Sequence, residues 1–404
     1  MVTNPPSPQR GDRQWLARLL HALFFVLAAT QTAIVPLLPR LSHLYHLTPT
    51  SSALLLAAPG VATLAISLPA GLFAERLGAR RMTVAATVIA ALAALAQALP
   101  SYPMLMLGRL AFGLAFGMIW TTGVAWLSST HGEAGSPKLG AVATSAAVGM
   151  AVGPALGGIL ADQVGIATPF VIVSGLAAAL AGVLWRQPGV NRVPTLARDS
   201  LAALTRRAPR SPGVVNGACV LAITGAVGGV TQLLVPLALH GAGFSAGATG
   251  IAFSASAGVY ILISAVVVRL GRRVTTLRAT ALAGLALALS LLPAALSAST
   301  VVLVAVLVVS TVPRAVASTV AYPVATEAAA LAGLGDGVVI GLLNGTWAMG
   351  LVLAPLLAGF VDQAFGTEMA VASTVLPGVL VATWLLVRPA RRIAVSGEPA
   401  VAGA

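Results

Sequence analysis

Two arginines are the residues best suited to chemistry in this sequence, because each lies inside a long apolar run. Neither Arg109 nor Arg314 has an Asp or Glu within ten positions on either side. A cation in apolar surroundings attracts carboxylate and phosphate groups. Each arginine could instead be structural, with a guanidinium that reaches the membrane interface or bonds to carbonyls of a neighbouring helix. We predict a functional role for both.

Several uncharged polar residues also lie in apolar runs, where polar groups are costly and therefore candidates for function. We assign His21, Gln31, Gln232, Tyr322 and Asn344, together with the two arginines, to a substrate or proton pathway. A histidine can exchange a proton near neutral pH, although a histidine close to the end of an apolar run is often structural. No Ser/His/Asp group or metal-ligand cluster stands out, so we predict no enzyme activity, no catalytic residue, no cofactor and no metal.

The elements that position these residues are expected to be membrane-spanning helices. Hydrophobic residues make up 58% of the chain and charged residues 8%, against about 45–50% and about 25% in soluble domains. A membrane-spanning helix needs about 20 apolar residues, whereas a β-barrel would show alternating polarity. The sequence predicts an all-α polytopic membrane protein.

Twelve apolar stretches can be read, six on each side of a polar segment. They lie at about 16–38, 50–73, 82–100, 104–128, 139–161 and 167–186, and at about 214–239, 247–269, 279–297, 300–325, 335–360 and 370–387. The expected organisation is an N-terminal tail (1–15), a six-helix bundle (16–186), a linker (187–213), a second six-helix bundle (214–387) and a C-terminal tail (388–404).

The distribution of basic residues predicts the orientation, because cytoplasmic loops are enriched in Lys and Arg. Twenty of the 23 basic residues fall in the tails, the linker and alternate loops; Arg40 lies on the opposite side, and Arg109 and Arg314 lie within spans. We predict a multi-pass protein of the cell membrane (inner or plasma membrane) with both termini in the cytoplasm. The net charge of +13 then reflects topology and does not indicate nucleic acid.

The two halves of the chain contain related segments. Gly149, Pro154 and Gly158 recur 201 positions later as Gly350, Pro355 and Gly359. Half of the 404 residues is 202, so the offset is close to half the chain. This is the parallel repeat found in some transporters.

Two motifs contain closely spaced glycines. Residues 149–158 contain Gly149, Gly153 and Gly157 at intervals of four, together with Pro154 and Gly158; this spacing lets two helix backbones approach closely in lipid. Residues 71–81 are expected to form a short charged turn between the second and third spans. Its key positions are Gly71, Glu75, Arg76, Gly78 and Arg80.

These motifs resemble those of the major facilitator superfamily. Residues 71–81 are similar to its signature loop, Gly-x-Leu-Ala-Asp-Arg-x-Gly-Arg-Arg/Lys, with Glu75 in place of the Asp, and residues 149–158 match its antiporter motif, Gly-x-x-x-Gly-Pro-x-x-Gly-Gly. Arg109, Gly113 and Gly117 resemble its Arg-x-x-x-Gly-x-x-x-Gly element. Pro36 and Pro39 resemble the Pro-x-x-Pro element of its twelve-span drug:proton antiporters.

The resemblance implies two six-helix bundles around a cavity that opens alternately to each side of the membrane. Glu75 and Arg80 would latch the bundles at the cytoplasmic face, and Arg109 would influence proton transfer. The implied function is proton-coupled efflux of a small hydrophobic or amphipathic compound. The implied partners are this substrate, protons and the lipid bilayer, with the chain acting as a monomer.

The distribution of acidic residues argues against one version of this function. None of the ten Asp and Glu residues falls in the middle of a predicted span, whereas the resembling exporters of cationic drugs use an embedded carboxylate. A carrier of a small organic anion, which uses the embedded arginines, therefore remains an alternative. A receptor that binds without transport is less favoured, because no polar segment is long enough to fold as a soluble domain.

Overall fold

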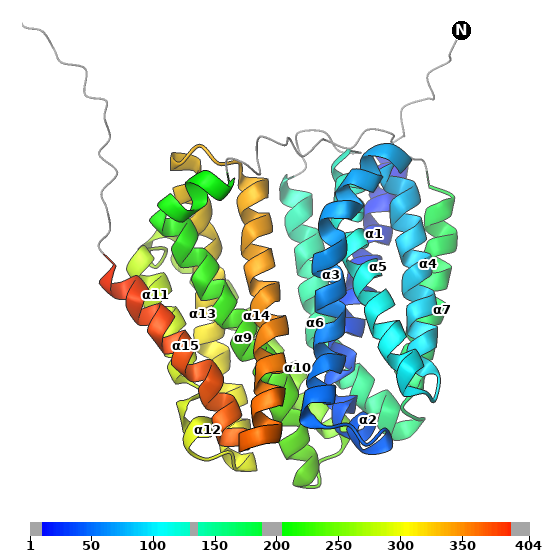
Figure 1. Ribbon diagram of the computed structural model, residues 1–404. Coiled ribbons are helices and arrows are strands. Elements are labelled where there is room, and N and C mark those ends of the chain that lie inside the picture. Colours follow the sequence, from blue (N-terminus) through cyan, green and yellow to red (C-terminus); the bar gives the residue numbers. More distant parts are fainter. Residues whose placement is uncertain (1–9, 130–135, 188–203, 389–404) are drawn as a thin grey trace, which may run out of the picture.

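The computed structural model describes residues 10–129, 136–187 and 204–388. These residues form helices, turns and short connections, and twelve spans are long and apolar enough to cross a membrane. The predicted all-α polytopic fold is therefore confirmed (Figure 1).

The described helices fall into two bundles that lie side by side in Figure 1. The first contains α1 (Arg10–Ala33), η1 (Val35–Leu37), α2 (Leu38–Leu44), α3 (Pro49–Leu77), α4 (Ala79–Ala98), α5 (Tyr102–Ser129), α6 (Ser136–Gln163) and α7 (Thr168–Trp185). The second contains η3 (Ala208–Arg210), α9 (Pro212–Gly241), α10 (Ala246–Leu270), η4 (Gly271–Arg273), α11 (Leu277–Leu289), α12 (Leu292–Leu296), α13 (Thr300–Leu331), α14 (Asp336–Phe365) and α15 (Thr367–Val387).

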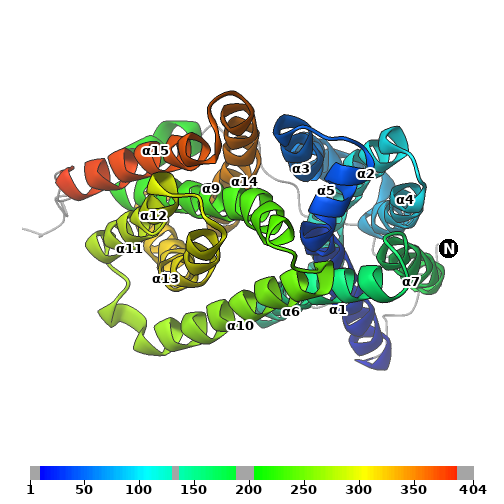
Figure 2. The same ribbon diagram turned by 90° about the horizontal axis from the view of Figure 1, so that it is seen from below.

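Successive spans run in opposite directions, which defines two faces of the molecule. We call the face where α7 ends and α9 begins the linker face, and the opposite face the distal face. The linker face is at the top of Figure 1, and Figure 2 is seen from below, where the distal face lies. Helices α1, α6, α9 and α14 start at the linker face, whereas α3, α5, α10 and α13 start at the distal face.

Helix starts follow local sequence signals at three positions. Thr48, Ser245 and Thr276 each precede a helix, and their hydroxyls accept hydrogen bonds from the N–H groups of residues three positions later, at 3.2, 3.2 and 3.1 Å. Such caps satisfy backbone donors that have no partner within the helix. They fix the starts of α3, α10 and α11.

The first span differs from its predicted bounds of 16–38. The helix ends at Ala33, tightens into the 3₁₀ turn η1 and resumes as α2 to Leu44. Pro36 and Pro39 each lack a backbone N–H, so a regular helix cannot pass through both without losing hydrogen bonds. The span therefore continues further than expected, with an interruption at the prolines.

Two main clusters of buried apolar side chains hold the described helices together. In the first bundle the largest fully buried apolar side chains include Phe24, Phe112 and Trp126. A larger cluster centres on α9 of the second bundle, where Leu221, Val227 and Leu233 are buried, and it continues into the first bundle through Leu37 and Leu55. Large apolar residues such as Leu262 and Val268 of α10 are exposed, as expected for a surface that faces lipid. The larger cluster therefore joins the two bundles, whereas the smaller one lies within the first bundle.

Candidate functional site

The predicted antiporter motif on α6 has two structural roles. A Cβ atom at Gly149, Gly153 or Gly157 would overlap the backbone of α1. These glycines therefore let α6 and α1 pack backbone to backbone within the first bundle. The same close packing occurs in the second half of the chain, because Gly350 of α14 lies against the backbone of α9.

The last glycine of the motif faces the other bundle. A Cβ at Gly158 would overlap the carbonyl of Ala246 on α10 and lie 3.0 Å from the Cα of Gly247. A Cβ at Gly250 of α10 would likewise overlap the carbonyl of Pro154. The repeat partner, Gly359 of α14, would place a Cβ 2.8 Å from the carbonyl oxygen of Pro49 on α3. The bundles thus meet along α6–α10 and α3–α14, as Figure 2 shows.

A charged group reinforces the α6–α10 contact. Asp162, near the end of α6, accepts a hydrogen bond from the backbone N–H of Gly247, in the first turn of α10, at 2.7 Å. Arg40 pairs with Asp162 at 2.7 Å and donates to the carbonyl of Ala161 at 3.0 Å. A carboxylate at a helix N-terminus is favoured by the helix dipole and by the free N–H groups. Asp162 therefore links its own bundle to the start of a helix in the other.

Two further polar contacts join the bundles. The backbone N–H of Ala155 donates to the Ser254 hydroxyl of α10 at 3.0 Å. The Thr50 hydroxyl of α3 contacts the Gln363 side-chain oxygen of α14 at 2.7 Å and the Gly359 carbonyl at 3.3 Å. These hydrogen bonds between the bundles lie in the distal halves of the four helices. The described hydrogen bonds between the bundles therefore seal the interface at the distal face.

The signature segment differs from the expected turn. Helix α3 continues to Leu77, so Gly71, Glu75 and Arg76 lie on a helix and only Gly78 separates α3 from α4. Gly78 has a φ of 88°, which a residue without a Cβ adopts readily. One such residue is enough to reverse the chain, and no longer turn forms. The expectation of a short loop here was wrong.

The proposed latch is only partly visible. The side chain of Glu75 lies outside the described residues. Arg80 donates a hydrogen bond to the carbonyl of Trp185 and lies over its ring at 5.7 Å. Both contacts are within the first bundle, so Arg80 does not pair across the interface through them.

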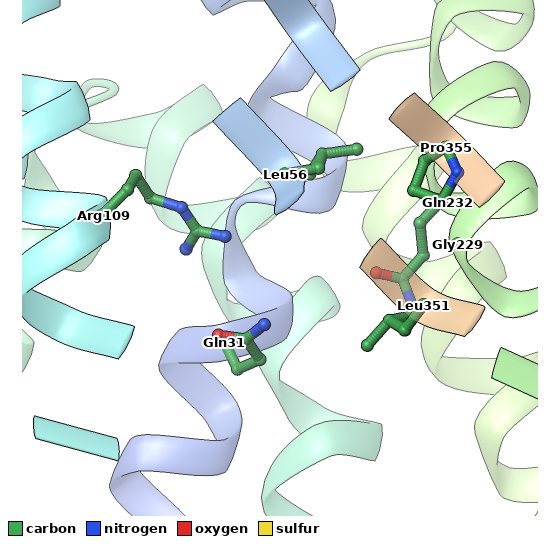
Figure 3. Close-up of a pocket in the computed structure, with 7 residues that line it drawn as sticks. All are labelled: Gln31, Leu56, Arg109, Gly229, Gln232, Leu351 and Pro355. Carbon is green, nitrogen blue, oxygen red and sulfur yellow. The ribbon is translucent and has the colours of Figure 1, made fainter. Parts of the chain in front are cut away.

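Arg109 lines a small cavity between the bundles, shown in Figure 3. Its side chain is 1% exposed. Its Nε donates to the carbonyl of Leu55 on α3 at 3.2 Å, whereas Nη1 is buried without a hydrogen-bond partner. Gln31 and Gln232 line the same cavity, with Leu56, Gly229, Leu351 and Pro355. The structure thus brings three of the predicted pathway residues together.

Arg314 belongs to a second polar group, on the other bundle. Its guanidinium lies over the ring of Tyr260 at 5.7 Å, and its Nε is buried without a partner. The hydroxyl of Tyr322 donates to the side-chain oxygen of Asn344 at 2.5 Å, and Tyr260 is within electrostatic reach of both Arg314 and Tyr322. We call Arg314, Tyr260, Tyr322 and Asn344 the Arg314 group.

His21 lies apart from both arginines. Its Nδ1 is 3.0 Å from the hydroxyl of Ser145, which connects α1 to α6 near the linker face. Aromatic residues occupy the neighbouring part of the first bundle, where the ring centroids of Phe24 and Trp120 are 4.7 Å apart and Phe116 lies 6.2 Å from Trp120.

Sequence reasoning missed two features of the interface. It treated Arg40 and Asp162 only as charges at span ends, because nothing in the sequence shows that they meet. It also overlooked that Thr30-Gln31 recurs as Thr231-Gln232, at the offset of 201 that relates the two halves. That signal was readable and marks the two glutamines as equivalent positions. Among the described residues, no three His, Cys, Asp or Glu side chains are placed to hold a metal ion.

Two repeated helical bundles, sealed at one face and lined with polar residues between them, define a membrane transporter rather than an enzyme. The chain belongs to the Major Facilitator Superfamily, whose family model matches residues 20–339.

Solved structures of transporters share this fold. A bacterial homolog to the human lysosomal transporter Spinster, in an inward-facing and unoccupied conformation, superposes with a TM-score of 0.76 at 15% sequence identity, covering 94% of this chain and 97% of that chain. The nucleoside transporter NupG, as a variant, gives 0.70 at 14% identity, covering 92% and 99%. At such identities the similarity establishes the fold and leaves the substrate to be argued from the site.

Proposed function

We propose that this transporter works by alternating access and exports a small hydrophobic or amphipathic compound in exchange for protons. The main observation in support is the position of the contacts that seal the interface: the described hydrogen bonds between the bundles lie at the distal face. With 20 of the 23 basic residues in tails, linker and alternate loops, we assign the linker face to the cytoplasm. On this assignment, the closed distal face supports the proposal that an exporter accepts its substrate in this state.

The contrast between the bundles supports an amphipathic substrate. The first bundle offers the partly exposed ring of Trp120, packed on Phe24 and Phe116. The second offers the Arg314 group. Aromatic rings bind apolar bodies, while a guanidinium and neighbouring hydroxyl and amide groups bind a polar head.

The proton carrier would have to differ from the embedded carboxylate of cation exporters. Of the described carboxylates, Asp162 is engaged by Arg40 and Gly247, and Asp362 accepts a hydrogen bond from Thr367. His21, whose Nδ1 lies 3.0 Å from the Ser145 hydroxyl, is our candidate, because an imidazole offers both a donor and an acceptor nitrogen.

One observation favours a second function, transport of a small organic anion. Arg314 is only partly buried, has an Nε without a partner and contacts an aromatic ring instead of a carboxylate. A cation left without a counter-charge in a membrane is expensive, and an anionic substrate would neutralise it.

The experiment separates the two functions by driving force and by substrate charge. Everted vesicles with an imposed pH gradient are tested with a neutral hydrophobic dye, and proteoliposomes with an aromatic carboxylate. The first function predicts gradient-driven dye transport that Arg314→Gln reduces about two-fold or less. The second predicts carboxylate flux that Arg314→Gln abolishes and Arg314→Lys partly restores.

Arg278→Gln is the matched control, because it removes an exposed arginine at the start of α11. It should leave both activities unchanged. Binding of either compound without flux would contradict both functions.

A further inference from the structure

The cavity at Arg109 contains a buried cation without a counter-charge. Arg109 is 1% exposed and lines the cavity; its one described hydrogen bond runs from Nε to Leu55, and its buried Nη1 has no partner. The salt bridge found among the described residues joins Arg40 to Asp162 and does not involve Arg109. A buried charge without a counter-charge is strongly unfavourable, so an anion in this cavity would be stabilised.

The size of the cavity restricts that occupant. Its free space is about 10 Å³, which suffices for about one water molecule or one ion of similar size. The proposed organic substrate does not fit, and none of the residues of the Arg314 group lines this cavity.

The other polar groups at the cavity are two equivalent amides. Gln31 and Gln232 are related by the repeat, and the preceding residues, Thr30 and Thr231, bond to their own helices at 2.7 and 2.9 Å. The Oε1 of Gln31 is buried without a partner. A half-turn of an amide exchanges its oxygen and its NH₂ group, so Gln31 can donate to an anion instead of accepting from a water.

The charge of Arg109 has no counterpart at the equivalent position in the second half of the chain. The position equivalent to Arg109 is Ser310, at the same offset of 201, and its hydroxyl contacts the Leu307 carbonyl of its own helix. The residues that line this cavity therefore include two amides but a single cation, which matches one monovalent anion.

We propose that Arg109, Gln31 and Gln232 bind a single halide-sized anion when the distal face is closed. The cavity wall comes from both bundles: Gln31, Leu56 and Arg109 belong to the first, and Gly229, Gln232, Leu351 and Pro355 to the second. Separation of the bundles at the distal face would divide the site. A ligand that binds one of two states shifts the equilibrium toward that state, so the anion stabilises the form that is closed at the distal face.

Thermal unfolding of the full chain in lipid nanodiscs tests the binding, with sodium chloride and bromide compared with sodium gluconate at equal ionic strength. A ligand of the folded state raises the Tm in a manner that depends on its concentration. We expect a halide-dependent rise that Arg109→Gln abolishes. Arg314→Gln should retain it, because Arg314 does not line this cavity.

Gln31→Glu is a second test, whose outcome does not depend on whether the Arg109→Gln variant folds correctly. It supplies a carboxylate beside Arg109, so we expect a Tm in gluconate at least equal to that of the unsubstituted chain in chloride, and no further response to halide. Equal Tm values for the unsubstituted chain in halide and gluconate would show that the cavity holds water only. A response lost in Arg314→Gln but kept in Arg109→Gln would place the anion elsewhere. Either result overturns the proposal.

A separate experiment tests whether the anion favours the state that is closed at the distal face. Val352 of α14 is 3% exposed and lies against Gly60 of α3, between the bundles. The introduced thiol of Val352→Cys, in a Cys219→Ser background, should react more slowly with a thiol reagent in chloride than in gluconate. This difference should disappear in Arg109→Gln; persistence of the difference there would contradict the link between the anion and the closed distal face.

Discussion

The two ends of the bundle interface are built differently. At the distal end, backbone packs on backbone at Gly158 and Gly250, and Asp162 bonds directly to the N-terminal turn of α10. At the linker end, Arg80 contacts Trp185 of its own bundle. The distal seal therefore depends on close fit, which small changes in side-chain volume can break. Because alternating access needs two states of similar free energy, changes at the distal seal should shift the balance in proportion to the contact they remove.

The largest effect is expected from Gly158→Leu. The added side chain would overlap the backbone of α10 at Ala246, so the distal face could not close. Overpacking costs about 1–3 kcal/mol or more, and about 1.4 kcal/mol changes an equilibrium tenfold. We expect transport to fall at least about ten-fold, and a cysteine at Val352 in the Cys219→Ser background to react at least about ten-fold faster.

Gly341→Leu is the control for this change. Gly341 lies on α14 with no atom within 4 Å of an added Cβ. It should leave transport and labelling within about two-fold of the unsubstituted chain. An equal loss in both variants would show that added volume alone, and not the distal seal, causes the effect.

Gly149→Leu should destabilise the first bundle and have a smaller effect on the equilibrium between the two states of the transporter. Gly149 belongs to the same motif as Gly158, but its Cβ would overlap the Phe25 carbonyl of α1, within one bundle. The cost of overpacking, about 1–3 kcal/mol, then lowers the stability of the first bundle. We expect a Tm lower by several degrees, with labelling of the Val352 cysteine unchanged at temperatures well below the transition. Faster labelling at those temperatures would contradict the division of the motif into packing and sealing positions.

The sequence predicted the fold far better than the interface. Hydropathy identifies the twelve spans, because every span must be apolar and about 20 residues long. The glycine spacing predicts close helix packing, yet it does not show that Gly149 faces α1 while Gly158 faces α10. That division depends on where the second bundle lies.

The candidate site was predictable as a set of residue types but not as an arrangement. Polar residues in spans stand out because they are costly in lipid, and this singled out Arg109, Gln31 and Gln232. Their meeting at one cavity depends on contacts between helices distant in sequence. The choice of the distal face for the seal could not be read either, because the same sequence must also form the opposite state.

Asp162→Asn should have an intermediate effect. Asparagine can still accept the hydrogen bond from Gly247 but loses the ion pair with Arg40 and the charge at the start of α10. Because the pair is partly exposed, its contribution is about 0.5–1 kcal/mol. We expect the Val352 cysteine to react about two- to five-fold faster.

Asp362→Asn provides the matched control. Asp362 occupies the corresponding end of α14, but it accepts a hydrogen bond from Thr367 in its own bundle, at 2.7 Å. Its replacement should leave the labelling rate unchanged. If Asp362→Asn accelerated labelling as much as Asp162→Asn, the effect would come from charge near the membrane surface and not from the cross-bundle contact.

Thr50→Val should give the smallest effect. It removes neutral hydrogen bonds to Gln363 and Gly359 across the α3–α14 contact while it keeps nearly the same side-chain volume. A neutral hydrogen bond contributes about 0.5–1.5 kcal/mol net, and the exposure of the Gln363 contact points to the lower end, so labelling should rise about two-fold. Thr63→Val is the control on the same helix, because Thr63 bonds to the Gly113 carbonyl within the first bundle at 2.8 Å. An effect of Thr50→Val as large as that of Gly158→Leu would mean that polar contacts, and not backbone fit, close the distal face.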